Sequence, residues 1–175
     1  MVEDSGRAGR DDRTDALVER VLGERGKMMA LEVSGPEVDE FVQRLDLALD
    51  VAFGGTVSYV GARMVLGSAC TTAAKAVDQI VAALQLPYSA ARGWGDLLDA
   101  LGDRPVSRRE CVVVADASQL LRHEDHDRWR ELVGALHGGP YCLGGGWSTL
   151  VLADHGFAWQ DWVFRSVAEV PGLGS

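Results

Sequence analysis

Residues 111–115 (CVVVA) are the sequence feature that most restricts what this chain can fold into. The run is apolar and rich in β-branched side chains, and it lacks the polar alternation of a strand with one wet face. Strands of this kind are buried on both faces, as in a parallel sheet that helices cover. The segment therefore predicts an α/β fold, in which helices connect parallel strands.

Two more apolar segments, 64–66 and 149–153, are predicted strands. Residues 73–84 carry an apolar stripe at helical spacing, and Thr71 and Thr72 are candidate N-caps. Two further helices are predicted, at 94–101 and 125–137. The order strand, helix, short helix, strand, helix, strand predicts a small three-stranded parallel sheet packed with helices over residues 63–154.

The residues before this core predict a disordered arm followed by an α/β extension. Residues 1–13 are polar, of mixed charge and without a period, so we expect disorder there. The extension covers 14–62. Within it we expect a helix from Thr14 to Gly23, a strand at 28–33 and an amphipathic helix that Pro36 opens.

The C-terminal segment 155–175 is unusually aromatic for the end of a chain. Its apolar side chains are Phe157, Trp159, Trp162, Val163 and Phe164. If these side chains were exposed to solvent, they would form a hydrophobic patch that promotes aggregation, so we expect the tail to pack on the core. A helix that binds a partner is the alternative.

Composition narrows the classes of function. The formal net charge is −9, and this excess of carboxylates argues against a protein that binds nucleic acid directly. Most of it lies in residues 1–62, which carry −6, whereas 63–154 carry only −2. No apolar run is long enough to span a membrane, and the N-terminus lacks the apolar core of a secretory signal. Three distant cysteines suit a reducing bacterial or cytosolic compartment better than a disulfide framework.

Candidate catalytic and metal-binding patterns are weak. The cluster at 123–127 (HEDHD) has two imidazoles and three carboxylates that could ligate zinc, but the start of a solvated helix explains it better. Buried packing is the better account of Cys70, Cys111 and Cys142. We find no phosphate-binding loop and no nucleophile paired with a base. We therefore expect no enzyme activity, no cofactor and no metal.

The short helix at 94–101 has an acidic face. Asp96, Asp99 and Asp103 follow one another at i, i+3 and i+7, so they share one side. The residues expected to turn the other way are Leu97, Leu98 and Leu101. Such a face could present carboxylates to a basic protein. A merely solvated surface is the alternative interpretation.

Residues 64–101, which include a helix ending in Leu-Pro and the segment WGDLLDAL, resemble the first strand, first helix, loop and second helix of the barstar family. The later strand, helix and strand continue the family order, so the resemblance covers about 63–154. Barstars are small intracellular inhibitors of secreted ribonucleases. The resemblance implies inhibition by insertion of the second helix and its preceding loop into the active site of the nuclease.

The resemblance also implies a set of partner-binding residues. The principal acidic position of the family falls on Asp99, and its other acidic position falls on Gly95, with Asp96 beside it. A loop position that is often aromatic falls on Ser89, and Arg92 adds a positive charge to a surface that should be acidic. The expected contact surface comprises Ser89, Arg92, Trp94, Gly95, Asp96, Asp99 and Asp103.

Two functions from different classes follow. The first is a non-enzymatic immunity protein, or antitoxin, whose acidic helix occludes the active site of a basic ribonuclease or related toxin. The second is a protein-interaction module that kept the fold and lost nuclease inhibition. Gly95, Ser89 and Arg92 favour this second function because they depart from the family pattern.

Overall fold

The computed structural model describes residues 4–55, 59–105, 108–138, 146–156 and 159. Within them lie five α-helices, four strands and three short 3₁₀ segments. The helices are α1 (Asp4–Gly23), α2 (Gly35–Phe53), α3 (Ala73–Leu84), α4 (Trp94–Gly102) and α5 (His126–His137). The strands are β1 (Met28–Glu32), β2 (Val60–Leu66), β3 (Arg109–Ala115) and β4 (Trp147–Asp154). The 3₁₀ segments are η1 (Gly67–Ala69), η2 (Tyr88–Arg92) and η3 (Ala117–Gln119).

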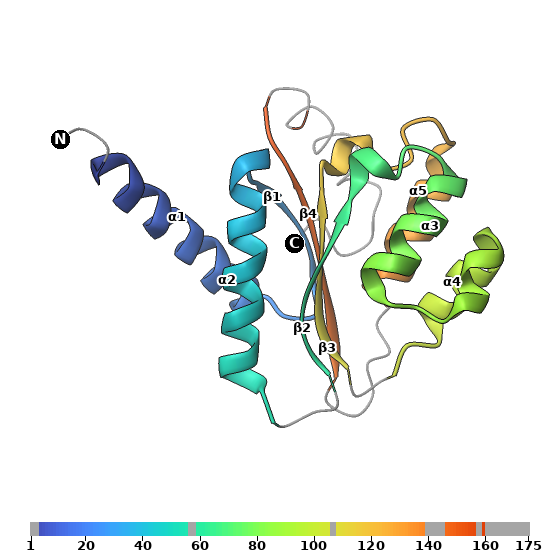
Figure 1. The fold of residues 1–175 in the computed structure, drawn as a ribbon, viewed down its shortest axis with the longest axis horizontal. Coiled ribbons are helices and arrows are strands. Elements are labelled where there is room, and N and C mark those ends of the chain that lie inside the picture. Colours follow the sequence, from blue (N-terminus) through green and yellow to red (C-terminus); the bar gives the residue numbers. More distant parts are fainter. Residues whose placement is uncertain (1–3, 56–58, 106–107, 139–145, 157–158, 160–175) are drawn as a thin grey trace.

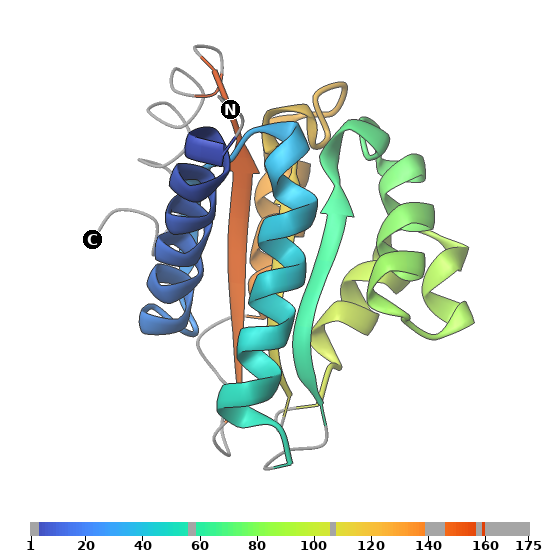
Figure 2. The ribbon, with the colours of Figure 1, turned by 60° about the vertical axis from the view of Figure 1, so that its left-hand side comes forward.

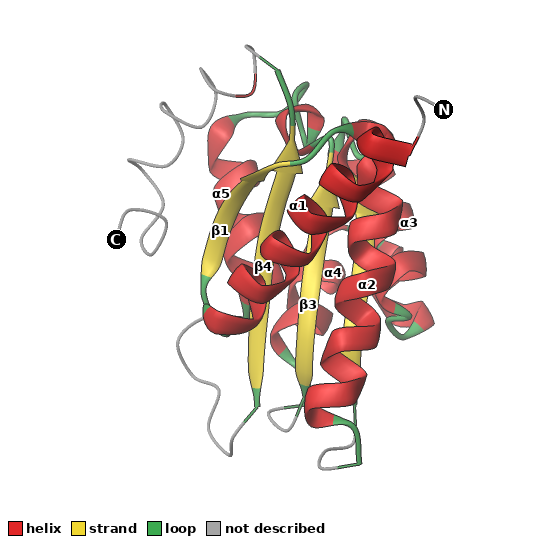
Figure 3. Ribbon diagram, turned by 90° about the vertical axis from the view of Figure 1, so that its left-hand side faces the viewer, coloured by secondary structure: helices red, strands yellow, loops and turns green. Residues whose placement is uncertain are grey.

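The strands form one parallel sheet in the order β1-β4-β3-β2. Figure 3 shows this sheet behind α1 and α2. The predicted α/β class and parallel strands are confirmed. The predicted count of three strands is wrong, because β1 pairs with β4 in parallel, with Met28 opposite Leu150 and Ala30 opposite Leu152. The N-terminal extension therefore adds a strand to the sheet that the rest of the chain builds.

Helices cover both faces of the sheet. In Figure 1, α1 and α2 lie on one side and α3, α4 and α5 on the other, and Figure 2 shows α1 and α2 side by side in front of the sheet. Strand β3 explains the arrangement, because its side chains alternate: Cys111 and Val113 face α1 and α2, while Val112 and Val114 face the other three helices. All four are fully buried, as the uninterrupted apolar run predicted.

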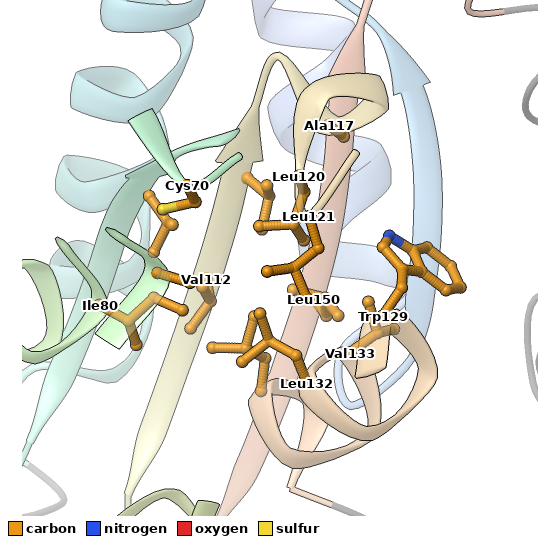
Figure 4. Packing of buried hydrophobic residues seen from close by; sticks show 14 of the residues in the cluster. Cys70, Ile80, Val112, Ala117, Leu120, Leu121, Trp129, Leu132, Val133 and Leu150 are labelled. Carbon is orange, nitrogen blue, oxygen red and sulfur yellow. The ribbon is translucent and has the colours of Figure 1, made fainter. Parts of the chain in front are cut away.

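The core beneath α3 and α5 is closely packed. In Figure 4, Ile80 of α3 and Leu132 of α5 approach Val112 and Leu150 of the sheet, and each of these side chains is 0% exposed. The helix α3 begins as predicted, since the hydroxyl of Thr72 accepts a hydrogen bond from the amide of Lys75. This helical layer supports the short helix α4.

The N-terminus differs from the prediction. We expected disorder over 1–13 and a helix from Thr14, but α1 begins at Asp4. The prediction of disorder is therefore wrong for residues 4–13, whereas the predicted end at Gly23 is confirmed.

Contacts with residues far away in the sequence hold the part of α1 around residues 11–15, and no local pattern reveals them. The guanidinium of Arg44, on α2, pairs with Asp11 at 2.6 Å and with Asp15 at 2.7 Å. Arg13, which lies between these two aspartates in the sequence, donates to the carbonyl oxygen of Glu32 at 3.2 Å. These partners are 19 to 33 residues away in the sequence.

The aromatic tail is described at one position. Trp159 is 3% exposed and belongs to the core cluster beneath α5, and the packing of the whole tail on the core stays a prediction. The other predicted tail residues, Phe157, Trp162, Val163 and Phe164, lie outside the described residues.

Candidate functional site: an acidic face beside a hollow

Two carboxylates of α4 and the carboxylate of its C-cap residue lie on one surface. Asp96, Asp99 and Asp103 are all exposed, and all three line the same hollow, of about 310 Å³. The prediction that these three carboxylates share one side of the helix is therefore confirmed. Its opposite side is anchored, because Leu97 and Leu101 are 0% and 1% exposed.

The third leucine of α4 does not follow the prediction. Leu98 is half-buried and does not turn fully inward. An α-helix rotates by about 100° per residue, which places Leu98 about 100° from Leu97 and on the flank of the helix. Gly95 lies on this same flank, between Leu98 and Asp99.

The hollow has apolar and cationic walls as well as acidic ones. Ser89, from η2, is one of the residues that line it. Its other walls come from the turn after α3, from α4 and from the segment that follows α4: Gln85, Leu86, Pro87, Ala100, Arg104, Pro105 and Arg108. The surface therefore presents carboxylates next to apolar side chains, a combination that suits a protein partner.

Gly95 and Arg92 lie where the family pattern is broken. Gly95 is exposed, and a Cβ atom added to it would meet no other atom within 4 Å. A longer side chain therefore fits at this position without any rearrangement. Arg92, at the end of η2, is exposed too, and it brings one positive charge close to the start of α4.

Trp94 does not line the hollow. Its indole N–H donates to Oε2 of Glu131 on α5 at 3.1 Å, and the guanidinium of Arg128 lies 5.5 Å from the centre of its ring. The predicted contact residue is thus engaged with α5. The six other predicted residues lie on the exposed surface of η2 and α4.

Tyr88 is a surface residue that our sequence analysis missed. It is 86% exposed and directly precedes Ser89, the position at which the family often has an aromatic residue. An aromatic ring at a protein surface is a common anchor in interfaces. The signal was available in the sequence, as a tyrosine one residue away from the expected place.

A buried ion cluster lies behind the hollow and was also missed. Glu110, at the start of β3, is 1% exposed and pairs with Arg104 and, at 2.5 Å, with Arg108. The guanidinium of Arg108 also lies over the ring of Tyr59. A glutamate that begins a buried strand was the signal, since a buried carboxylate requires a cationic partner.

The histidine-rich cluster serves as a helix start. Asp125 is the N-cap of α5 and accepts a hydrogen bond from the amide of Arg128 at 2.9 Å. Glu124 accepts from the amide of Ala73 at 2.7 Å, at the start of α3. In the described parts of the chain, no group of three or more His, Cys, Asp or Glu residues could hold a metal ion. Nor does any helix there have the length and apolar character needed to cross a bilayer.

The cysteines that the structure describes are buried thiols. Cys70 and Cys111 are both 0% exposed and both free. Burial raises the pKa of Cys70 to about 11, and burial together with the charge of Glu110 raises the pKa of Cys111 further. Neither is a nucleophile at neutral pH. Cys142 lies outside the described residues.

Comparisons with known proteins bear on the fold and on the family. Residues 62–138 match the family described as Barstar (barnase inhibitor), so the resemblance seen in the sequence is confirmed over that range. No curated protein matches the chain.

Two solved structures are similar in fold. One is the ORC2 protein of Aeropyrum pernix in ADPNP-ADP complexes, with a TM-score of 0.63 and 15% identity over 96% of this chain and 46% of that chain. The other is Drosophila ORC bound to poly(dA/dT) DNA and Cdc6, with a TM-score of 0.56 and 16% identity over 94% of this chain and 27% of that chain. The chain spans less than half the length of either, and at such identity the likeness concerns the fold alone.

Proposed function

We propose, because residues 62–138 match the barstar family, that this protein is an inhibitor that binds a ribonuclease or a related toxin and occludes its active site. Proteins of that family are inhibitors and not enzymes. The observation that supports the proposal most is the acidic face of α4, where Asp96, Asp99 and Asp103 are exposed around one hollow.

The proposed mechanism is substitution of carboxylates for phosphates. A ribonuclease holds the RNA backbone with cationic side chains, and the carboxylates of α4 would meet those same groups. Asp99 lies between Asp96 and Asp103 along the helix, so it would be the most fully desolvated of the three. Complementary charges at an interface mainly raise the association rate and the specificity for the partner, and they contribute less to the affinity.

Tyr88 would extend the contact beyond the charges. It is exposed at the first position of η2, next to Ser89, so a partner that covers α4 and η2 would bury its ring. Buried aromatic residues contribute a large share of the binding energy in many interfaces. The partner is accordingly a basic nuclease or toxin with an apolar contact beside its cationic site.

The setting we propose is the cytoplasm of the bacterium that produces the nuclease, where an immunity protein or antitoxin would protect the cell. The net charge of residues 63–154 is only −2. Long-range steering would therefore be weak, and the local carboxylates would do most of the attraction.

An interaction module without inhibitory activity is the second candidate. Three observations favour it: Gly95 supplies no carboxylate, Ser89 supplies no ring, and Arg92 is a cation on the surface that should be acidic. In that case the chain would bind a protein through η2 and α4 without blocking RNA cleavage.

Affinity capture followed by a nuclease assay distinguishes the two functions. The full chain is immobilised and exposed to secreted and cytoplasmic proteins of its source organism, and the captured proteins are assayed for RNA cleavage with and without added chain. Barnase serves as a defined probe in parallel. We expect a captured ribonuclease whose activity the chain abolishes. Captured proteins without nuclease activity would favour the module instead.

A further inference from the structure

The acidic helix α4 depends on its neighbours for its orientation. It has nine residues, and helices of this length are not stable by themselves in water. Its N-cap is Gly93, whose lack of a side chain means that no side-chain oxygen caps the first turn. Contacts outside the helix must therefore fix the direction in which its carboxylates point.

The first of these contacts is at the start of α4. The indole N–H of Trp94 donates to Oε2 of Glu131, and the guanidinium of Arg128 covers the ring. Both partners belong to α5. The first residue of the acidic helix is thereby joined to the outer side of α5.

The second contact is just after the end of α4. The guanidinium of Arg104 donates through Nε to the carbonyl oxygen of Leu101 at 3.0 Å, within the last turn of α4. Its Nη2 atom donates to the carbonyl oxygens of Ala135 at 2.9 Å and of Leu136 at 2.7 Å, within the last turn of α5. One cation thus satisfies carbonyl groups at the C-terminal ends of both helices, where their dipoles favour positive charge.

The same guanidinium is fixed from behind. Its third nitrogen pairs with Glu110 of β3, and the side chain of Arg104 is only 8% exposed. Between the two ends of α4, Leu97 and Leu101 are buried in the core that α5 shares. The helix α5 and the start of β3 therefore hold α4 at both ends and along its inner side.

We propose that Trp94 and Arg104 are positioning residues, which clamp α4 to α5 so that the carboxylates of its outer face are ordered before a partner arrives. The proposal rests on the proposed function, because it assigns the clamp a purpose in binding. Ordering a contact surface in advance lowers the entropy lost on association, and it slows dissociation of the complex.

The test compares two variants that differ in one hydrogen-bond acceptor. Glu131→Gln removes the charge and keeps an oxygen that accepts from Trp94, whereas Glu131→Leu has a similar volume and no acceptor. Glu131 is exposed, so both variants fold. Amide hydrogen exchange is measured on the free protein across α4, with the buried amides of β3 as an internal reference.

We expect the amide exchange rate in α4 to rise about fivefold in Glu131→Leu, because a fivefold change corresponds to the loss of one net hydrogen bond. In Glu131→Gln the rate should remain near that of the parent protein. Exchange in β3 should be unchanged in both. Trp94→Phe, which keeps a ring and removes the donor, should behave like Glu131→Leu. Equal exchange in α4 for the parent, Glu131→Gln and Glu131→Leu would overturn the clamp.

Binding kinetics then test its purpose. With barnase or the captured nuclease as the probe, Glu131→Leu should dissociate several times faster than Glu131→Gln and associate at the same rate. In an Asp99→Ala background this difference should disappear, because a positioning residue acts through the carboxylate it positions. Faster exchange in α4 with equal dissociation rates would refute the role in binding. A parent chain that captures no nuclease would count against the proposed function, while the exchange data still decide whether the clamp exists.

Discussion

Asp99 occupies the middle of the acidic face, on a helix whose other side is fixed by Leu97 and Leu101. Because its carboxylate is exposed and no described contact uses it, Asp99→Ala should change the free energy of unfolding by no more than about 0.5 kcal/mol. If the proposed function holds, Asp99→Ala should weaken nuclease binding by about 2–5 kcal/mol. This is the general range for removing one partner of a buried charge pair, and measurements on the barstar–barnase complex are among those that define it. Thermal melting and binding kinetics measure the two effects.

Asp78→Ala is the matched control, since Asp78 is an exposed carboxylate on α3 outside the hollow. It should leave binding unchanged, and Asp96→Ala should have an intermediate effect. If Asp99→Ala and Asp96→Ala both bind the nuclease as tightly as the parent chain does, α4 is not the interface and the interaction module becomes the better hypothesis.

Gly95 offers a gain-of-function test. Gly95→Asp should fold without strain because a Cβ atom there meets open space. It should also stabilise the protein by about 0.5–1 kcal/mol, since glycine is a poor helix former and a carboxylate near a helix N-terminus is favourable. On the inhibitor hypothesis it should tighten binding to barnase, as measured by inhibition titration. Gly95→Asn separates the effect of charge from that of the helix, and equal affinity of both variants would count against electrostatic recognition.

The buried thiols predict low chemical reactivity. With a pKa of about 11, only about one Cys70 side chain in a thousand is a thiolate at pH 8, and Cys111 is lower still. In a Cys142→Ala variant, a disulfide reagent such as Ellman's should therefore label no thiol in the folded protein and two in denaturant. Rapid labelling of the folded variant would show that one of these sites is open.

At the level of elements, the hydrophobic pattern of the sequence predicted the helices and strands whose form depends on residues close together in the chain. The stripe through Ile80 and Leu84 predicted α3, and the run at 111–115 predicted the buried strand β3. The place of β1 was not predictable in this way, because its pairing with β4 joins residues more than 120 positions apart. The clamp by Arg104 was missed for the same reason, since its partners lie on three different elements.

The helix α2 is predicted to be essential to the fold, although it precedes the family match. Phe41 is 1% exposed and packs on the sheet face that the matched region leaves uncovered. Phe41→Ala should lower the free energy of unfolding by about 3–5 kcal/mol. On the same helix Val51 is 80% exposed, so Val51→Ala should stay within about 0.5 kcal/mol. Urea denaturation of both variants compares them, and similar midpoints would contradict the prediction.

For the whole molecule, we propose that the N-terminal extension and the barstar-like region are one folding unit. Removing α1, β1 and α2 would expose one face of the sheet, including Val113 and Val151, which are both 0% exposed in the complete chain. A fragment of residues 63–154 should therefore aggregate or melt well below the full chain. Limited proteolysis that yields a stable 63–154 fragment with an unchanged melting transition would contradict this proposal.

The central claim is occlusion of a nuclease active site, and a stoichiometric titration of RNA cleavage tests it most directly. Increasing amounts of the full chain are added to a fixed concentration of the captured ribonuclease, above the dissociation constant of the complex. The account predicts that cleavage falls linearly to zero at one chain per nuclease, and that Asp99→Ala requires a clear excess to reach the same inhibition. Cleavage that continues while the complex is fully formed would contradict it.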